Sequence, residues 1–168
     1  TLEGCAFVGN TANAAGAVLW NSNSTINNCT FTGNTAVENG GAVVTLSYDP
    51  FTWHYWDSWL PKLNGCEFTR NIAGSRGGAL AAQGHAYLKD CTFTNNETKV
   101  YNDDLDCYEG GGAMFILLKT VTLENCNSSG NSTPNGGGQG IQLYLNTTLK
   151  FVGDNSSEGI KYGSCQLE

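Results

Sequence analysis

The segment Cys29-Thr30-Phe31-Thr32-Gly33-Asn34, followed by Gly40-Gly41-Ala42-Val43, decides the fold of this chain. The same two motifs recur together along the sequence, and such internal repetition is the signature of stacked repeat architectures. The first motif begins at Cys5, Cys29, Cys66, Cys91 and Cys126, and a degraded sixth copy runs from Leu149 to Asp154. The second motif begins at Gly16, Gly40, Gly77, Gly111 and Gly136, and Gly159 takes its place in the sixth copy.

The repeat length separates a regular unit from two insertions. Successive cysteines lie 24, 37, 25 and 35 residues apart, so the unit has about 24 residues. The two longer spacings predict loops that bulge from an otherwise regular structure. We place these insertions at about residues 48–61 and 97–109.

The unit is built of strands. Cys and Phe lie two residues apart and share one face, while Thr30, Thr32, Thr69, Thr92 and Thr94 take the other. Further short strands are expected after each glycine motif and before each next cysteine, which gives three per unit. We therefore predict an all-β single domain over residues 1–168, a right-handed parallel β-helix (solenoid) of about six rungs with two loop insertions. A leucine-rich solenoid, the alternative, would need a leucine pattern and a helix that this sequence lacks.

Stacking of such units at about 4.8 Å predicts ladders of like residues along the axis. The sequence predicts a Phe ladder, a buried Cys ladder, and an Asn ladder in which side-chain amides bond to the copies above and below. The Gly-Gly-Ala turn is expected to need a positive φ.

The combination of Phe-x-x-Asn with Gly-Gly-Ala-[Val/Leu/Met] resembles the repeats of the polymorphic outer membrane protein family, the Chlamydia-type surface adhesins. The resemblance covers roughly Gly4 to Gly138, and both motifs recur together four times. It implies a β-helical module with adhesive or structural work and no catalytic residues. The chain departs from that family in lacking an autotransporter barrel and in having Ser128 where Phe is expected.

The amino-acid composition argues against some classes of function and favours an extracellular location. The net charge is −7 and only 8 residues are Lys or Arg, which argues against binding nucleic acid or anionic membranes. The longest apolar run, Ala113–Leu118, is too short to cross a membrane. Seven cysteines and seven Asn-x-Ser/Thr sequons predict a secreted or cell-surface glycoprotein. Asn23, Asn28, Asn127 and Asn146 are the better glycosylation candidates, because Asn96 and Asn131 also occupy the Asn ladder.

The first insertion carries the predicted contact residues Trp53, Tyr55, Trp56 and Trp59. Flat aromatic rings stack on sugars and anchor protein interfaces, so this loop is interpreted as a binding surface for surface glycans or proteins. It must either fold over one flank of the solenoid or project from it. The alternative is a hydrophobic flap that packs on its own solenoid.

The second insertion is acidic. Its carboxylates form a weak candidate for Ca²⁺, although their spacing matches no EF-hand and a solvated acidic loop is the alternative. A disulfide between Cys107 and Cys165 would attach this loop to the C-terminal rung. No Cys-x-x-Cys pair is present, and we expect no other metal site and no cofactor. The Ca²⁺ candidates are Asp103, Asp104, Asp106 and Glu109.

Enzymatic function has little support in the sequence. Polysaccharide lyases and hydrolases use β-helices, but they need paired carboxylates or basic groups on one face. The available groups are scattered over Glu67, Arg70, Arg76, His85, Lys89 and Asp90. An ice-binding protein that uses the outward threonines is a further alternative, although Glu67 interrupts the array.

Neither end of the chain shows a capping helix, so we expect either that the chain is part of a longer solenoid or that copies stack end to end into a filament. The reading favoured by the sequence is a non-enzymatic extracellular β-solenoid, an adhesive or structural module. Its predicted partners are further copies of itself, or surface glycans and proteins.

Overall fold

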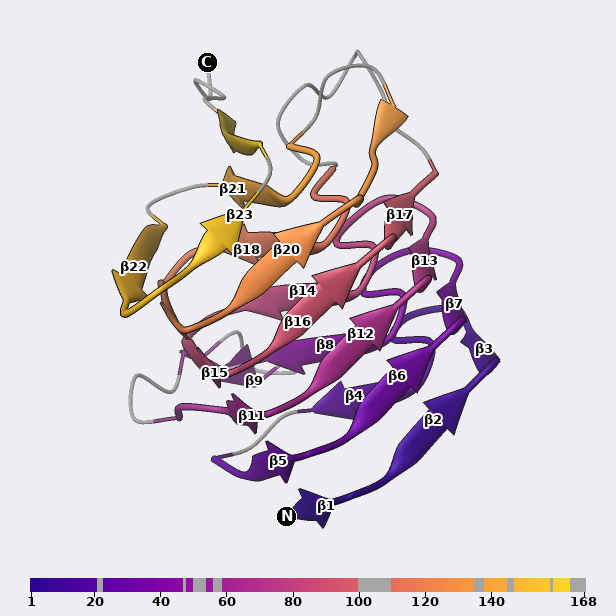
Figure 1. Ribbon diagram of the computed structural model, residues 1–168, viewed down its shortest axis with the longest axis horizontal. Coiled ribbons are helices and arrows are strands. Elements are labelled where there is room, and N and C mark those ends of the chain that lie inside the picture. Colours follow the sequence, from indigo (N-terminus) through magenta and orange to yellow (C-terminus); the bar gives the residue numbers. More distant parts are fainter. Residues whose placement is uncertain are drawn as a thin grey trace.

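The chain forms a stack of parallel strands that coils about one axis (Figure 1). This computed structural model describes residues 1–20, 23–46, 48–49, 54–55, 59–99, 110–134, 138–144, 147–157 and 159–163. Within these ranges the regular elements are strands, and none is a helix long and apolar enough to cross a membrane. Each turn of the chain is called a rung here. The first four rungs pass through four sheets in the order A, B, C and D, and the last two have strands in sheets A, B and D.

Sheets A and B each contain six parallel strands, one from every rung. Sheet A consists of β1 (Leu2–Glu3), β5 (Thr25–Asn27), β11 (Lys62–Asn64), β15 (Ala86–Lys89), β19 (Thr120–Glu124) and β22 (Thr148–Val152). Sheet B consists of β2 (Ala6–Val8), β6 (Thr30–Thr32), β12 (Glu67–Thr69), β16 (Thr92–Thr94), β20 (Asn127–Ser129) and β23 (Ser156–Ser157).

Sheets C and D complete the rung, and a separate two-stranded hairpin interrupts it once. Sheet C consists of β3 (Thr11–Ala12), β7 (Thr35–Ala36), β13 (Ile72–Ala73) and β17 (Glu97–Thr98). Sheet D consists of β4 (Val18–Trp20), β8 (Val43–Leu46), β14 (Leu80–Gln83), β18 (Met114–Leu117), β21 (Ile141–Tyr144) and β24 (Ile160–Gly163). The hairpin pairs β9 (Tyr48–Asp49) with β10 (His54–Tyr55).

The predicted parallel β-helix of about six rungs is confirmed. The rung has four strands where the sequence predicted three, because a two-residue strand of sheet C follows the Asn corner after sheet B. Since Glu97 and Thr98 form β17 in register with Ile72 and Ala73, the second insertion begins after Thr98.

The predicted ladders fill and line the inside of the coil. The rings of Phe7, Phe31, Phe68 and Phe93 stack at centroid distances of 4.9, 4.8 and 4.7 Å. At the corner after sheet B, the Asn34 amide donates to the Phe7 carbonyl at 3.0 Å and to Asn71 Oδ1 at 2.9 Å. The same bonds recur at Asn71 and Asn96, so one side chain per rung satisfies the polar groups of the corner.

The Gly-Gly-Ala turn between sheets C and D is tight for two separate reasons. Gly40 has φ of 58°, a region that residues with a Cβ rarely adopt. Gly41 faces the next rung, where an added Cβ would overlap the carbonyl oxygen of Gly78. The positive φ that the sequence predicted for this turn is therefore confirmed at Gly40.

The sixth copy is not aligned as the sequence predicted. Phe151 pairs with Leu123 in sheet A. In the sixth rung, the position in register with the Phe ladder is occupied by Ser157, which pairs with Ser128. The turn at Gly153, with φ of 68°, is the one that precedes sheet B. The Phe-Val-Gly-Asp string matched the repeat by composition, but the register of the backbone places it about six residues earlier in the rung.

Sheet D differs from sheet B on its outer side. Residues such as Val43 and Leu80 point into the main core, so their neighbours Val44 and Ala81 point outward. These outward residues are nevertheless buried, and so is Phe115. A second hydrophobic cluster, separate from the main core, comprises Ala15, Val44, Leu46 and Ala81.

Candidate contact surfaces

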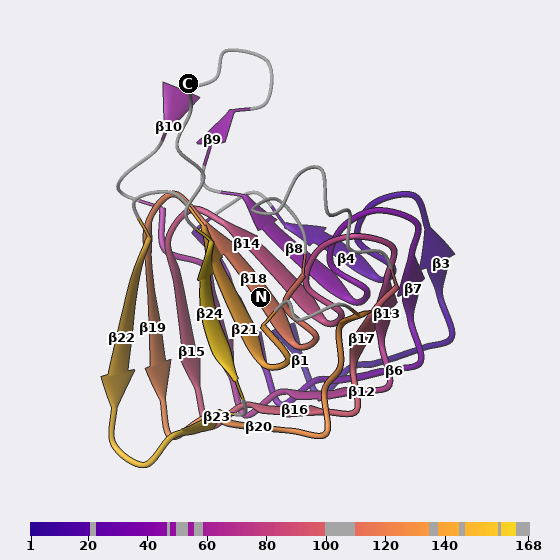
Figure 2. The same cartoon turned by 90° about the horizontal axis from the view of Figure 1, so that it is seen from above.

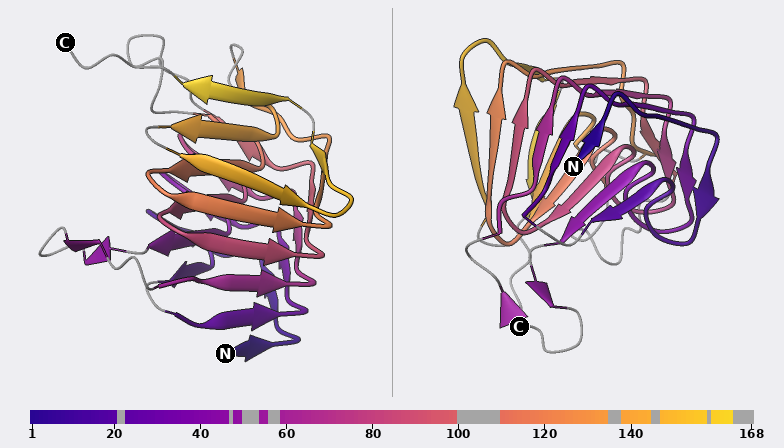
Figure 3. Two further views of the ribbon diagram at one scale, coloured as in Figure 1. Left: turned by 90° about the vertical axis from the view of Figure 1, so that its left-hand side faces the viewer. Right: turned by 90° about the horizontal axis from the view of Figure 1, so that it is seen from below.

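The first insertion projects from the coil. Its strands pair antiparallel, with His54 opposite Asp49 and Tyr55 opposite Tyr48, and the hairpin stands away from the stacked rungs (Figures 2 and 3). The hairpin leaves the coil at the corner between sheet D and sheet A, after β8 and before β11. Of the two arrangements that the sequence allowed, folding over a flank or projecting, the structure has the second.

The four aromatic residues predicted as contacts are described only in part. Trp53 and Trp56 lie outside the described residues, and only the backbone of Tyr55 is described. Trp59 is half-buried at the base of the hairpin, beside the exposed Leu60. The Leu60 amide donates to Asn23 Oδ1 at 3.3 Å, which ties the hairpin base to the preceding rung. Their contact role stays a prediction.

The sequons divide into exposed and buried sites. Asn23, Asn28 and Asn127 are exposed, whereas Asn146 lies outside the described residues. The Asn28 amide donates to Glu3 Oε1 at 2.9 Å, a surface contact that water can replace.

The ladder sequons at Asn96 and Asn131 are buried, and their amides bond inside the coil. Asn155, the remaining sequon, continues the column of cysteines and accepts a hydrogen bond from the Cys126 amide at 2.8 Å. These three amides are engaged in the folded chain.

The other predicted ligand groups fall where the structure gives no description. Cys107 and Cys165, the disulfide candidates, lie outside the described residues. So do the Ca²⁺ candidates Asp103, Asp104, Asp106 and Glu109. Among the residues that are described, no three His, Cys, Asp or Glu side chains are grouped as a metal site would require.

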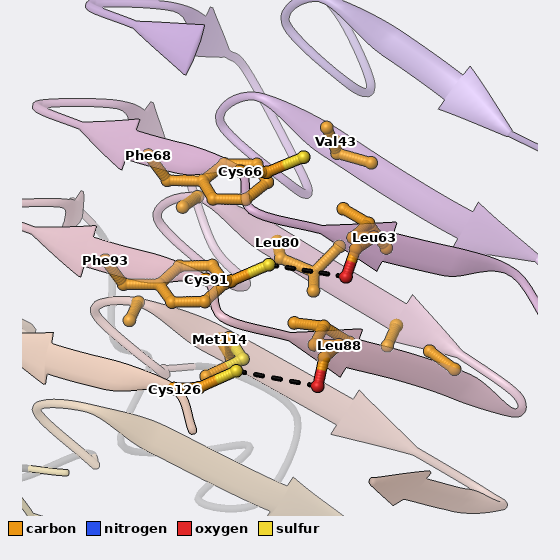
Figure 4. Close-up of a cluster of buried hydrophobic side chains, with 14 of the residues drawn as sticks. Val43, Leu63, Cys66, Phe68, Leu80, Leu88, Cys91, Phe93, Met114 and Cys126 are labelled. Atoms are coloured by element: carbon orange, nitrogen blue, oxygen red, sulfur yellow. Dashed lines mark hydrogen bonds between the residues drawn. The ribbon is translucent and has the colours of Figure 1, made fainter. Parts of the chain in front are cut away.

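The cysteine ladder is a column of buried thiols (Figure 4). Cys91 Sγ contacts the Leu63 carbonyl at 3.4 Å, and Cys126 Sγ contacts the Leu88 carbonyl at 3.5 Å. Hydrogen bonds with the thiols of Cys126 and Cys66, together with burial, raise the pKa of Cys91. The same hydrogen bonds with Cys91 lower the pKa of Cys66 and of Cys126. Because Cys29, Cys66, Cys91 and Cys126 are buried in the core, the ladder contributes to packing.

The outer face of sheet A carries a polar network that the sequence reasoning missed. Lys89 pairs with Glu124 at 2.8 Å, and the Tyr87 hydroxyl donates to the same carboxylate. The hydrogen bonds from Lys89 and Tyr87 lower the pKa of Glu124. Both charged residues stand two positions before a ladder cysteine, so alignment on the cysteines would have placed them opposite each other.

The groups considered for catalysis do not converge. Arg70, with φ of 55°, occupies the exposed turn between sheets B and C. Arg76 lies between sheets C and D, with its guanidinium 5.5 Å from the centre of the Phe115 ring. His85 lies between sheets D and A, at a third corner of the same rung.

The outer face of sheet B carries two columns of side chains in register. One column runs through Thr32, Thr69 and Thr94, and the other through Thr30, Glu67 and Thr92. The threonines are half-buried while Glu67 is exposed. This flat arrangement follows from the repeat and was predicted from it.

The two ends of the coil expose edges. β1, β2 and β4 each have one partner strand, as do β22, β23 and β24 at the opposite end. Phe151 and Ile160, which continue columns that are fully buried in the middle rungs, are 48% and 38% exposed. The backbone groups along these edges have no neighbouring strand within the described residues.

Comparison with known proteins identifies the architecture. A family model described as right-handed beta helix region matches residues 15–166. No curated protein and no solved structure gives a match.

Proposed function

The chain belongs to the right-handed β-helix family, and we propose that this member is a non-enzymatic extracellular module with structural and adhesive work. The single observation that carries the structural part is the exposure of two core columns in the last rung: Phe151 and Ile160 are exposed, although the residues in register with them in the middle rungs are buried. Within the described residues, the strands of this rung have a partner strand on one side only. The partner proposed for this rung is a second copy of the same chain.

The register of the coil supports stacking of copies. Because every rung repeats the same sheet order, β22 of one copy would continue onto β1 of the next, and β23 onto β2. The columns then place Phe151 against Leu2 and Ile160 against Val18, which continues both apolar columns. Such head-to-tail contacts leave a free surface at each end of the growing assembly, so they produce filaments.

Sedimentation and negative-stain imaging over a range of concentrations test this proposal. We expect rods that lengthen with concentration, and we expect Phe151→Lys to abolish them because it places a charge in the contact. Thr94→Lys, on the outer face of sheet B, is the matched control and should leave the rods intact. A wild-type chain that remains a 17.9 kDa monomer throughout would contradict the proposal.

The adhesive part rests on the projecting hairpin and on the resemblance to the polymorphic outer membrane protein adhesins. A hairpin that stands clear of the coil presents its residues to a partner, and Trp53, Tyr55, Trp56 and Trp59 would supply the contacts. Binding to a glycan array, or to surface proteins of a host or neighbouring cell, should be lost in Trp56→Ala and kept in Thr94→Ala. Equal binding by both variants would refute the role of the hairpin.

An extracellular location predicts glycans at the exposed sequons. Mass spectrometry of native material should find them at Asn23, Asn28, Asn127 and Asn146, and not at Asn96 or Asn131. The same measurement tests the Cys107–Cys165 disulfide and, with added Ca²⁺, the acidic insertion. Unmodified asparagines at all four sites would count against secretion.

A second candidate function is ice binding by the outer face of sheet B. The specific observation is the uninterrupted column of Thr32, Thr69 and Thr94, in which hydroxyls repeat at the spacing of the strands. Thermal hysteresis that is lost in Thr69→Lys and kept in Thr122→Lys, on sheet A, would establish it. We propose no catalytic activity, and turnover of an acidic polysaccharide that is lost in Arg70→Ala or Arg76→Ala would overturn that view.

A further inference from the structure

The stack of rings inside the coil ends at Phe93. The next two positions of this column are Ser128 and Ser157, in register with Phe93 and with each other. Ser128 is nevertheless buried, with 4% of its surface exposed. Along this column, serine hydroxyls therefore replace the Phe rings at positions that remain inside the coil.

The column on sheet C changes one rung earlier. Ala36 and Ala73 are buried on this sheet, and Thr98 follows them in register. The bridge between Glu97 and Ser132 brings Thr133 to the level of Thr98 in the next rung. The two columns thus carry hydroxyls at Thr98 in the fourth rung, at Ser128 and Thr133 in the fifth, and at Ser157 in the sixth.

Most of these hydroxyls have no protein partner. The Thr98, Thr133 and Ser157 oxygens are buried and form no hydrogen bond with the described residues. Ser128 Oγ accepts a hydrogen bond from the Asn131 amide at 3.0 Å, and the same amide donates to the Phe93 carbonyl at 3.0 Å. A buried hydroxyl without a partner is unfavourable, and ordered water inside proteins bonds to two to four such groups.

We infer that Ser128, Ser157, Thr98 and Thr133 form an internal site for a short row of ordered water molecules that extends from the rung of Phe93 to the last rung. The site goes beyond the proposed function and is independent of it. It satisfies several hydroxyls at once, and it lies where the missing Phe ring reduces the volume of the side chains.

Thr45 provides the matched control within the same chain. It lies on the inner face of sheet D, and its hydroxyl is also buried without a partner. Its register neighbours are Trp20 and Ala82, so no second hydroxyl stands beside it in the column. An isolated hydroxyl cannot hold a water with enough bonds, and Thr45 is not part of the site.

Isosteric replacement of the two threonines gives opposite expectations. Thr98→Val removes a ligand of the bound water, so the melting temperature should fall by about 2–4 °C. Thr45→Val removes an unpartnered hydroxyl from an apolar setting, so the melting temperature should rise by a similar amount. A rise in both variants would overturn the proposal, since it would show Thr98 to be equally unsolvated.

Magnetic relaxation dispersion of water oxygen detects these water molecules directly and does not depend on stability. The wild-type chain and Thr45→Val should show the same number of long-lived internal waters, and Ser128→Phe should show fewer, because the added ring continues the stack through the site. Equal numbers in the wild type and Ser128→Phe would contradict the inference. If Ser128→Phe does not fold, the comparison is made with Thr98→Val.

Discussion

Sheets B and D are built from the same rungs, yet only one of them has a free outer face. In sheet B, polar and apolar residues alternate, as in Thr30-Phe31-Thr32, and the threonines face outward half-buried. In sheet D, strands such as β8 and β18 are apolar at nearly every position, and both faces are buried. Continuous apolar strands of parallel sheets are covered on both sides, and alternation marks the uncovered side.

The difference shows that this coil buries apolar side chains on the outer side of sheet D as well as in its interior. The Arg76 guanidinium lies over the Phe115 ring, and Phe115 contacts Tyr144 at 6.4 Å between ring centres. The outer face of sheet D therefore works as a second core, while the outer face of sheet B remains a surface. The contrast predicts that outward residues of sheet D contribute more to stability than outward residues of sheet B.

Truncation of an outward residue should give the largest contrast. Phe115→Ala should cost about 3–5 kcal/mol, because it opens a cavity at a fully buried position. Thr94→Ala, at an outward position of sheet B in the same rung, should change stability by less than about 0.5 kcal/mol. Urea denaturation followed by fluorescence measures both. Equal losses would show that outward burial in sheet D carries no energy.

Exchange of a methyl and a hydroxyl sharpens the contrast at constant volume. Val44→Thr places a hydroxyl in the outer cluster of sheet D and should cost about 1–3 kcal/mol. The reverse change, Thr32→Val in sheet B of the same rung, should stay within about 0.5 kcal/mol. Thermal melting of both variants at one pH provides the test, and a tolerated Val44→Thr would mean that water reaches this cluster.

The smallest effect is expected on the third exterior, the polar face of sheet A. The pKa of Glu124 is lowered in the folded chain, so its contribution to stability is complete above the ordinary value of 4.5 and is lost as the pH falls through the lowered pKa. Because the pair is exposed, salt should weaken the effect. Urea midpoints measured from pH 7 down to about pH 3, for wild type and Glu124→Gln, should converge in acid. Parallel curves would refute the assignment.

Much of the coil was predictable because the repeated Phe, Asn and Gly residues each have a specific structural role when the repeats stack. Phe31, Phe68 and Phe93 share a spacing with the ladder asparagines, and only in-register stacking gives these amides partners. The alternation around Phe31 also predicted which threonines face outward. The positive φ at Gly40 followed from the same motif.

Other features depend on contacts that a single repeat does not contain. The second core outside sheet D was missed, although the unbroken apolar run in β18 and the nearly unbroken one in β8 were the available signal. Phe151 was predicted in the Phe column but pairs with Leu123 in sheet A. The prediction relied on the similarity of residues 149–154 to the first motif and did not take account of the length of the preceding strand. The aromatic hairpin was recognised as an insertion from its length, but a contact surface depends on a partner that the sequence does not name.

The hairpin leaves the coil between β8 and β11 without disturbing the register on either side: Val43 still pairs with Leu80, and Lys62 still pairs with Thr25. The corner between sheets D and A therefore accommodates an insertion without any change in the register of the ladders. An inserted segment of different length or sequence can therefore be accommodated at this one junction without a change in the stacking of the rungs.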